Sequence, residues 1–439
     1  MVEKPTKSVL AGDLFRIAKL PLSLVVGCTA IYLVSFANLI SLFDQDADTT
    51  TTLDVQSLLK LLFIASLGVY SLHRMLVQPG MLKLMFSIPG LLLTVVSGWL
   101  MVTSLFSASP AVSLASALAS GACIWGAMGG ALQIGPDRVI RICGLACVAF
   151  LAGSWLLWLV NPEAATFLEP IDNGEFVARF GGFSHPNAVG QYAGLALLIA
   201  NCLFYPAAKT RGERLSVAAI AILAIVSLIA CASRTSILAT AISLAFIYRR
   251  SLLRGPMIAL IIGGGTVVLG SLILLSTQPG LGQKLNQRLI NLVSKSGTTE
   301  ELTSGTGRSQ IWGASLRLIA KRPLTGYGAA TSKELLADYT RYTHNMLLNV
   351  GLSGGIVPMG LLAAAFLYGF GRLWCDPQPV ADAIFLFLFL NGLAENVCFL
   401  VLDSAPMILL TTALIWRSVD SAVASGKLSV ASWKSGGAR

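Results

Sequence analysis

Long apolar segments alternate with short polar connections along almost the whole of this 439-residue chain. A transmembrane α-helix needs about 20 predominantly apolar residues, and one segment after another approaches or exceeds that length. The pattern predicts an all-α polytopic membrane protein. Its twelve expected transmembrane helices lie at about 20–42, 53–72, 84–106, 111–132, 139–160, 187–207, 214–232, 235–249, 256–276, 345–371, 380–401 and 406–417.

Composition supports the same class of protein. Hydrophobic residues make up 55% of the chain and charged residues 12%, whereas soluble domains carry about 25% charged residues. We therefore expect residues 1–439 to form one integral membrane domain. The stretch "MVEKPTKSVLAGDLFRIAKL" is too polar for a cleavable signal peptide. The net charge of +10 could suggest nucleic acid, but basic residues of a membrane protein first report its topology, so we expect no nucleic-acid partner.

The positions of Lys and Arg predict which connections face the cytoplasm. With the N-terminus inside, the short outer connections hold only Arg179 and Arg234, and the first outer connection is the acidic "DQDADTTT". Basic residues concentrate on the cytoplasmic side of membrane proteins, so both termini should be cytoplasmic, including a tail at 418–439. The segment 277–344 then forms one large periplasmic loop, since long loops cross largely regardless of charge.

This loop contains an expected amphipathic helix at about 308–321, within "SGTGRSQIWGASLRLIAKRPLTGYG". Ile311, Trp312 and Leu316 share one face of it, and Pro323 ends it. Arg308 lies in its first turn.

Other potential cations also stand where helices on the outer side begin. Arg179 and His185 precede the helix expected at 187–207, Arg234 follows the candidate cap Ser233, and His344 with Asn345 opens the helix at 345–371. A cation at a helix N-terminus costs about 0.3–1 kcal/mol. An anion with several oxygens would reverse that cost, because free N–H groups and guanidinium groups both bind phosphate. A lipid diphosphate is the obvious candidate at an outer membrane face.

Each of these residues also has a purely structural interpretation. An arginine at a membrane boundary often extends to the lipid headgroups, which applies to Arg179 and Arg234. Arg308 could be solvated, and His344 could cap its helix without a chemical role. His185, between Ser184 and Pro186, is more often a turn residue.

Four stretches in this order resemble the O-antigen ligase and polymerase superfamily, especially its exopolysaccharide polymerases. They are "RFGGFSHPNAVGQ", "SRTSILATAISL", "GTGRSQIWGASLRLIAKRPLTGYG" and "THNMLLNVGLSGGIVPMG". The resemblance covers about Arg179 to Gly360, whereas the first five expected helices match only in being apolar.

The resemblance implies a metal-independent, inverting glycosyltransferase of the C-type membrane architecture, with no cofactor. Its active site would face the periplasm from the bacterial inner membrane, and its donor would be an undecaprenyl-diphosphate-linked glycan. Arg179 and Arg308 match the family's diphosphate-binding arginines, Arg234 is a weaker match, and His344 matches the catalytic histidine. The acceptor would be a glycan or a lipid, and chain-length regulators or export proteins would be further partners. Supporting residues would be His185, Asn187, Asn345 and Glu395.

Two acidic features leave alternatives open. Asp44, Asp46 and Asp48 resemble an Asp-x-Asp metal motif, but the same run also serves topology, and we expect no metal ligand among them. Glu395 is costly inside a transmembrane helix and should face a polar cavity. Its partner could be an arginine of the site or Lys60, the other intramembrane charge.

The leading hypothesis is a polymerase that joins lipid-linked repeat units of a surface or secreted polysaccharide. A ligase that moves finished glycan onto lipid A-core or onto a protein shares this chemistry and is the alternative. A transporter or flippase of lipid-linked sugars is the rival from another class. Such proteins need polar groups spread through the spans. Here the polar residues gather on one face, which favours an enzyme.

Overall fold

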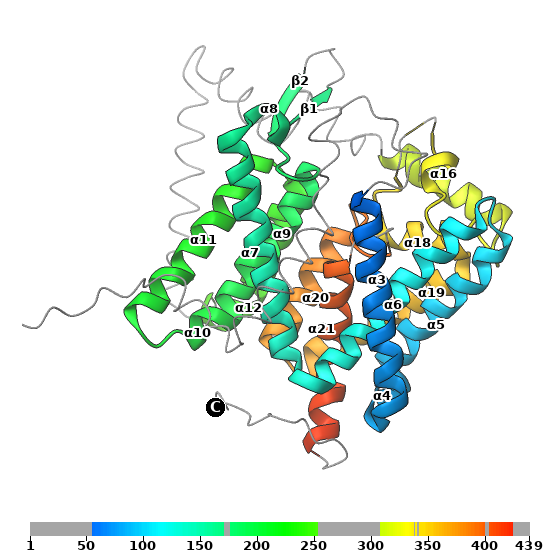
Figure 1. The fold of residues 1–439 in the computed structure, drawn as a ribbon, viewed down its shortest axis with the longest axis horizontal. Helices are drawn as coiled ribbons and strands as arrows, with labels where there is room; N and C mark the ends of the chain where they lie inside the picture. The colour runs from blue at the N-terminus through cyan, green and yellow to red at the C-terminus, as the bar shows by residue number, and fades with distance from the viewer. Residues whose placement is uncertain are drawn as a thin grey trace, which may run out of the picture.

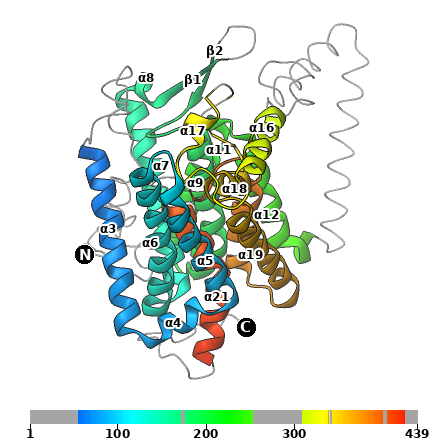
Figure 2. The same ribbon diagram turned by 90° about the vertical axis from the view of Figure 1, so that its right-hand side faces the viewer.

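The computed structural model describes residues 55–170, 176–252, 308–337, 339, 342–399 and 404–424. These residues form a bundle of helices with a short antiparallel hairpin at one end (Figure 1). We call the end that carries this hairpin and α16 the upper end, and the end that carries α4 the lower end, as both views show (Figure 2).

The first part of the bundle consists of helices that pack side by side. Proline occupies the first turn of most of them, where its missing N–H leaves no hydrogen bond unmade. The elements are α3 (Val55–Val77), α4 (Pro79–Met85), α5 (Ile88–Thr103), the 3₁₀ turn Ser104–Phe106, α6 (Pro110–Ile134) and α7 (Pro136–Val160).

The second part begins at the upper end with α8 (Pro162–Ala165) and the hairpin strands β1 (Thr166–Pro170) and β2 (Phe176–Phe180). The chain then runs three times along the bundle between its upper and lower ends. It does so through α9 (Pro186–Ile199) with the π-helical turn Ala200–Phe204 and α10 (Tyr205–Ala207), then α11 (Arg211–Cys231), then α12 (Arg234–Leu252). The hairpin is an addition to the all-α architecture expected from the apolar pattern.

The last part contains the helices that complete the upper end and the bundle. They are α16 (Arg308–Lys321), α17 (Ser332–Leu335), α18 (Met346–Gly354), α19 (Ile356–Cys375), α20 (Pro379–Gly392) and α21 (Ser404–Ala424). Helix α16 occupies the range expected for the amphipathic helix.

Six helices among the described residues are long and apolar enough to cross a membrane. They are Ile88–Phe106, Pro110–Ile134, Pro136–Val160, Pro186–Ala207, Arg211–Cys231 and Ile356–Cys375. The protein is therefore an all-α multi-pass membrane protein. The helices expected at 20–42 and 256–276, the loop residues 277–307 and the tail residues 425–439 lie outside the described residues.

Three expected helices differ most in the structure. The helix expected at 406–417 is α21, which continues to Ala424, so residues 418–424 of the expected tail are helical. The helix expected at 345–371 is two helices, α18 and α19, separated by Gly355, whose φ is +82°. A Cβ there would lie 2.2 Å from the carbonyl oxygen of Pro323, which accepts a hydrogen bond from the Ile356 amide. The helix expected at 380–401 ends at Gly392, so Glu395 lies in a non-helical segment that follows α20.

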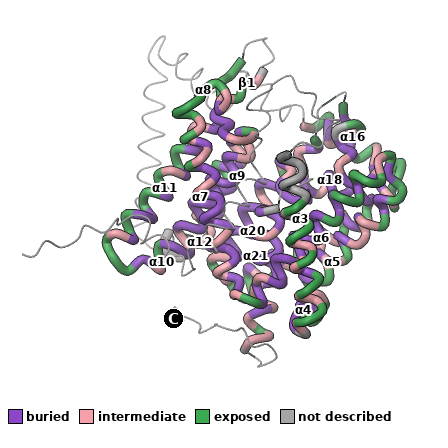
Figure 3. The backbone as a smooth tube through the Cα atoms, in the orientation of Figure 1, coloured by how far each residue is buried: buried purple, intermediate pink, exposed green. Residues whose placement is uncertain are grey.

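Large apolar side chains fill the centre of the bundle, where buried residues line the facing sides of α7, α9, α20 and α21 (Figure 3). Tyr192 of α9 and Phe150 of α7 are both fully buried, with ring centroids 4.7 Å apart. Gly194 lets α9 approach Phe387 of α20 closely, since a Cβ there would lie 2.5 Å from that ring. This packing fixes the positions of the helix ends that carry the polar site.

Candidate functional site

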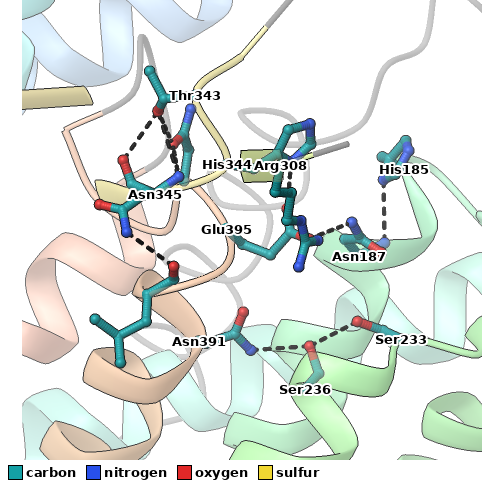
Figure 4. Close-up of polar contacts among 12 residues, drawn as sticks. His185, Asn187, Ser233, Ser236, Arg308, Thr343, His344, Asn345, Asn391 and Glu395 are labelled. Carbon is teal, nitrogen blue, oxygen red and sulfur yellow. Dashed lines mark hydrogen bonds and ion pairs between the residues drawn. The ribbon is translucent and has the colours of Figure 1, made fainter. Parts of the chain in front are cut away.

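A network of polar side chains lies at the upper end of the bundle, where α9, α16, the start of α18 and the segment after α20 meet (Figure 4). Its central residue is Glu395, whose side chain is 8% exposed. One carboxylate oxygen, Oε1, lies 2.6 Å from Nη2 of Arg308 and accepts a hydrogen bond from Nδ2 of Asn187 at 2.8 Å. The other, Oε2, lies 3.1 Å from Nδ1 of His344.

The charge state of Glu395 follows from these partners. Burial disfavours the carboxylate, but the hydrogen bond with His344 and the charges of His344 and Arg308 outweigh it. Together they hold the pKa of Glu395 below its ordinary value. Its expected partner was an arginine of the site or Lys60; in the structure it is Arg308, and the side chain of Lys60 is outside the described part.

His344 lies in a strained loop, and hydrogen bonds of both neighbouring residues hold this loop in place. Its φ of +48° is in the left-handed region, which a residue with a Cβ adopts only when its surroundings hold it there. Asn345 caps α18 by accepting from the Leu348 amide at 3.0 Å and donates to the Leu393 carbonyl at 2.9 Å. Thr343 donates to Asn396 at 2.7 Å. The loop that carries His344 is thereby bound to the segment that carries Glu395.

Arg308 is the first residue of α16, and its side chain is 23% exposed. Two contacts hold that helix in place. Trp312 donates from its indole nitrogen to the Thr343 carbonyl at 3.1 Å, and Ile311 and Ile319 lie in one apolar cluster with Leu352 of α18. The guanidinium therefore stands at a helix N-terminus beside His344 and keeps access to solvent.

Arg179 occupies a different environment from Arg308. It lies on β2, and its side chain is only 5% exposed. Its guanidinium donates to the Cys231 carbonyl at 2.9 Å, to Glu169 of β1 at 2.5 Å and to Oδ1 of Asn187 at 3.0 Å. Arg179 thus ties the hairpin, the end of α11 and the start of α9 together, and it reaches Glu395 through Asn187.

His185 is the N-cap of α9. Its Nδ1 accepts a hydrogen bond from the Asn187 amide at 3.2 Å, and its ring lies edge-on to Phe167 of β1, with centroids 4.7 Å apart. Desolvation, followed by the nearby charge of Arg179, lowers the pKa of His185, so the ring is neutral at pH 7. The residue keeps an exposed surface, through which solvent screens part of this effect.

Arg234 begins α12 and is half-buried. The residues around it are polar and buried: Ser233 donates to Ser236 at 3.0 Å, and Asn391 of α20 donates to Ser236 at 2.9 Å. These bonds bring the start of α12 to the end of α20, one turn before Glu395.

Sequence reasoning did not single out Glu169, Thr343, Asn391 or Asn396. The signal for Glu169 was present in the turn-forming run "IDNGE" between two short alternating segments, which is typical of a β-hairpin. In the register of that hairpin Phe167 pairs with Arg179, so Glu169, two residues along β1, projects from the same face. The other three carry no local signal, because their partners are far away in the sequence.

No group of three or more His, Cys, Asp or Glu within the described ranges is placed to hold a metal ion. The run with Asp44, Asp46 and Asp48 lies outside those ranges.

The fold and site together define a multi-pass membrane protein with a cluster of cationic and acidic groups at one end of its helices. Residues 219–364 match the family model described as O-antigen ligase, so the chain contains an O-antigen ligase family domain. Enzymes of this family are ligases and polymerases of lipid-linked glycans. The match includes Arg234, Arg308 and His344, whereas Glu395 lies beyond it. No curated protein matches the chain.

Proposed function

We propose that the protein is a membrane glycosyltransferase that polymerises undecaprenyl-diphosphate-linked repeat units of a surface or secreted polysaccharide. The observation that carries this proposal is the meeting of Arg308, His344 and Glu395 at the upper end, with two of the three inside the O-antigen ligase domain. A cation for a diphosphate and a base for a hydroxyl are the two groups that such a transfer needs.

Arg308 is the proposed ligand of the donor diphosphate. Its guanidinium stands at the first residue of α16, where the free N–H groups and the helix dipole also favour an anion. As the bond between the sugar and the phosphate breaks, negative charge grows on the leaving oxygen, and a fixed cation stabilises that charge. Arg234 would add to the positive potential, and Arg179 would act mainly by holding Asn187 and the hairpin in place.

His344 is the proposed base. Its imidazole would take the proton from an acceptor hydroxyl while that oxygen attacks the anomeric carbon from the side opposite the diphosphate, which inverts the configuration. The cationic side chains would supply the positive charge that a bound metal ion supplies in metal-dependent glycosyltransferases. The proposed reaction is therefore independent of metal and of any other cofactor.

The proposed topology places this site in the periplasm. Twelve transmembrane helices in a C-type arrangement, both termini in the cytoplasm and a periplasmic loop at 277–344 would put α16 and the upper end outside. Basic residues near the lower end support this orientation: Arg74 and Lys83 lie in the last turns of α3 and α4, and Arg372 lies in the last turn of α19. Residues 418–439 would then be cytoplasmic, and the enzyme would reside in the bacterial inner membrane.

A ligase that transfers the glycan to lipid A-core or to a protein is the second candidate, because the same donor site and base would serve it. A transporter is disfavoured by the placement of the charged groups. Arg308 begins α16, His344 lies just before α18 and Glu395 follows α20, so all three lie beside helix ends at the upper end of the bundle.

The test is transfer by the purified protein in lipid nanodiscs, supplied with an undecaprenyl-diphosphate oligosaccharide and excess EDTA. A polymerase lengthens the glycan with no other acceptor present, whereas a ligase forms product only when lipid A-core or a protein acceptor is added. Movement of donor across the membrane without a new glycosidic bond would overturn the enzyme proposal. Restoration of lost activity by Mg²⁺ or Mn²⁺ would overturn metal independence and direct attention to Asp44, Asp46 and Asp48.

A further inference from the structure

The two oxygens of the Glu395 carboxylate have separate partners. Oε1 accepts from Arg308 at 2.6 Å and from Asn187 at 2.8 Å, whereas Oε2 faces Nδ1 of His344 at 3.1 Å. Asn187 is itself oriented, because its amide oxygen accepts from Arg179 at 3.0 Å. The carboxylate is therefore fixed from one side and presents its second oxygen to the imidazole.

An ionised carboxylate only accepts hydrogen bonds, so the imidazole nitrogen that faces it must donate. The pKa of Glu395 is held below its ordinary value by His344 and Arg308 despite its burial, so the group is ionised at neutral pH. Nδ1 of His344 then carries the proton, and in the neutral ring Nε2 keeps its lone pair. A free histidine side chain prefers the opposite tautomer, so the site has to impose this one.

The backbone of His344 supports this orientation. Its φ of +48° is a strained conformation that the bonds of Thr343 and Asn345 to the segment 393–396 maintain. That segment is the one that carries Glu395. These hydrogen bonds hold the imidazole and its carboxylate together, although they come from two distant parts of the chain.

We propose that Glu395 is a positioning residue that fixes the Nδ1-protonated tautomer of His344, so that Nε2 is the atom that receives the acceptor proton. This inference rests on the proposed glycosyl transfer. In that step the acceptor oxygen bonds to the anomeric carbon, and the bond from that carbon to the phosphate oxygen breaks. The leaving lipid diphosphate keeps the electron pair, and the acceptor proton moves to Nε2. Glu395 stays ionised and faces the imidazolium that forms.

Nitrogen-15 NMR of histidine-labelled protein in nanodiscs tests the tautomer without any turnover. The chain has only three histidines, so His344→Gln assigns the resonance of interest directly. At a pH where the ring is neutral, we expect His344 to carry its proton on Nδ1 in the wild type. We expect the same in Arg308→Gln, because Oε2 of Glu395 can still accept a hydrogen bond from His344 in that variant. Glu395→Gln should shift the population toward the Nε2-protonated form. A wild-type His344 protonated on Nε2 would overturn the inference, whatever the activity.

Kinetics distinguish positioning from a general structural effect. Glu395→Gln is expected to lower kcat at least about 10-fold with a smaller change in donor KM, and to alter the pH profile of kcat. Glu334→Gln, at an exposed carboxylate of α17, serves as the control and should retain activity and the tautomer. If Glu395→Gln instead raises donor KM and leaves kcat and the tautomer unchanged, Glu395 acts only through Arg308. Failure of glycosyl transfer with an Nδ1-protonated His344 would refute the proposed function and leave the tautomer assignment standing.

Discussion

Arg308 and Glu395 lie 2.6 Å apart, between Nη2 and Oε1, although 87 positions separate them in the sequence. The pair places a cation that keeps 23% of its side-chain surface exposed beside a carboxylate that is 8% exposed. The partly exposed arginine can contact an incoming anion, while the buried carboxylate stays oriented toward its partners. Donor binding and acceptor activation would therefore depend on neighbouring residues with separable roles.

Replacement of Arg308 should weaken donor binding. Arg308→Ala is expected to reduce the affinity for undecaprenyl diphosphate by at least about 10-fold, and Arg308→Lys should restore only part of it, because an ammonium group does not reproduce the planar fork of arginine. Binding of the lipid diphosphate to the purified variants measures this. Arg317→Ala, at an exposed position on the same helix, is the control and should bind normally. Equal affinity in Arg308→Ala and the control would refute the assignment.

Replacement of His344 should slow glycosyl transfer and leave donor binding unchanged. General-base help contributes about 10²–10⁴-fold in rate, so His344→Ala should lose single-turnover transfer by that order while still binding donor. His185→Ala should lose much less, because His185 caps α9. Single-turnover transfer measured alongside donor binding compares the two variants. Weak binding with a normal rate at saturation would make His344 a phosphate ligand, with Glu395 the next candidate for the base.

Replacement of Arg179 should destabilise the upper end. Arg179→Ala leaves Glu169 without this ion pair and the Cys231 carbonyl without this donor. Glu169 keeps 20% of its side-chain surface exposed, so we expect a loss of about 2 kcal/mol, typical of a hydrogen bond to a charged group. Thermal unfolding in detergent should show a lower Tm than in the wild type. Arg214→Ala, at an exposed position on α11, should leave Tm unchanged. An unchanged Tm in Arg179→Ala with lost donor binding would instead support a direct phosphate contact.

The N-cap of α9 should make stability depend on pH. The folded state lowers the pKa of His185, so its contribution is complete above the unfolded value of about 6.5 and declines as the pH falls below it. His185→Asn keeps a capping side chain that does not titrate. We therefore expect its Tm to fall less between pH 7 and pH 5 than that of the wild type. His73→Asn, at an exposed residue of α3, is the control and should follow the wild type.

Reporter fusions test the topology. A reporter fused after Gln283 or Ser304 should be active only if it works in the periplasm, and one fused after Arg211, the first residue of α11, only if it works in the cytoplasm. The reverse pattern would place α16 and His344 on the cytoplasmic side. The argument for a lipid-diphosphate donor at an outer membrane face would then fail.

The sequence determined the class of protein and most of its helices. The length of an apolar segment predicts a membrane span directly. In lipid the backbone N–H and C=O groups must bond to each other, and a helix achieves this within one continuous segment. The amphipathic pattern and Pro323 likewise located α16 and the position of Arg308 at its start. The resemblance singled out His344 in the same way, as part of a continuous stretch of sequence.

Only the tertiary structure decided which of these residues meet. Asn187 and Glu395 are 208 positions apart and join through a hydrogen bond of 2.8 Å, which no periodicity can indicate. The apolar run 380–401 continues past the end of α20, so the sequence placed Glu395 in a transmembrane helix; the hydrogen bonds of the segment 393–396 to Thr343 and Asn345 hold it outside one. Arg179 and Arg308 look alike in sequence, as arginines near helix starts. They differ because one is enclosed by the hairpin and the end of α11, whereas the other keeps a solvent-exposed side. The burial of a side chain and the identity of its hydrogen-bond partners depend on packing between distant segments, and that packing exists only in the folded chain.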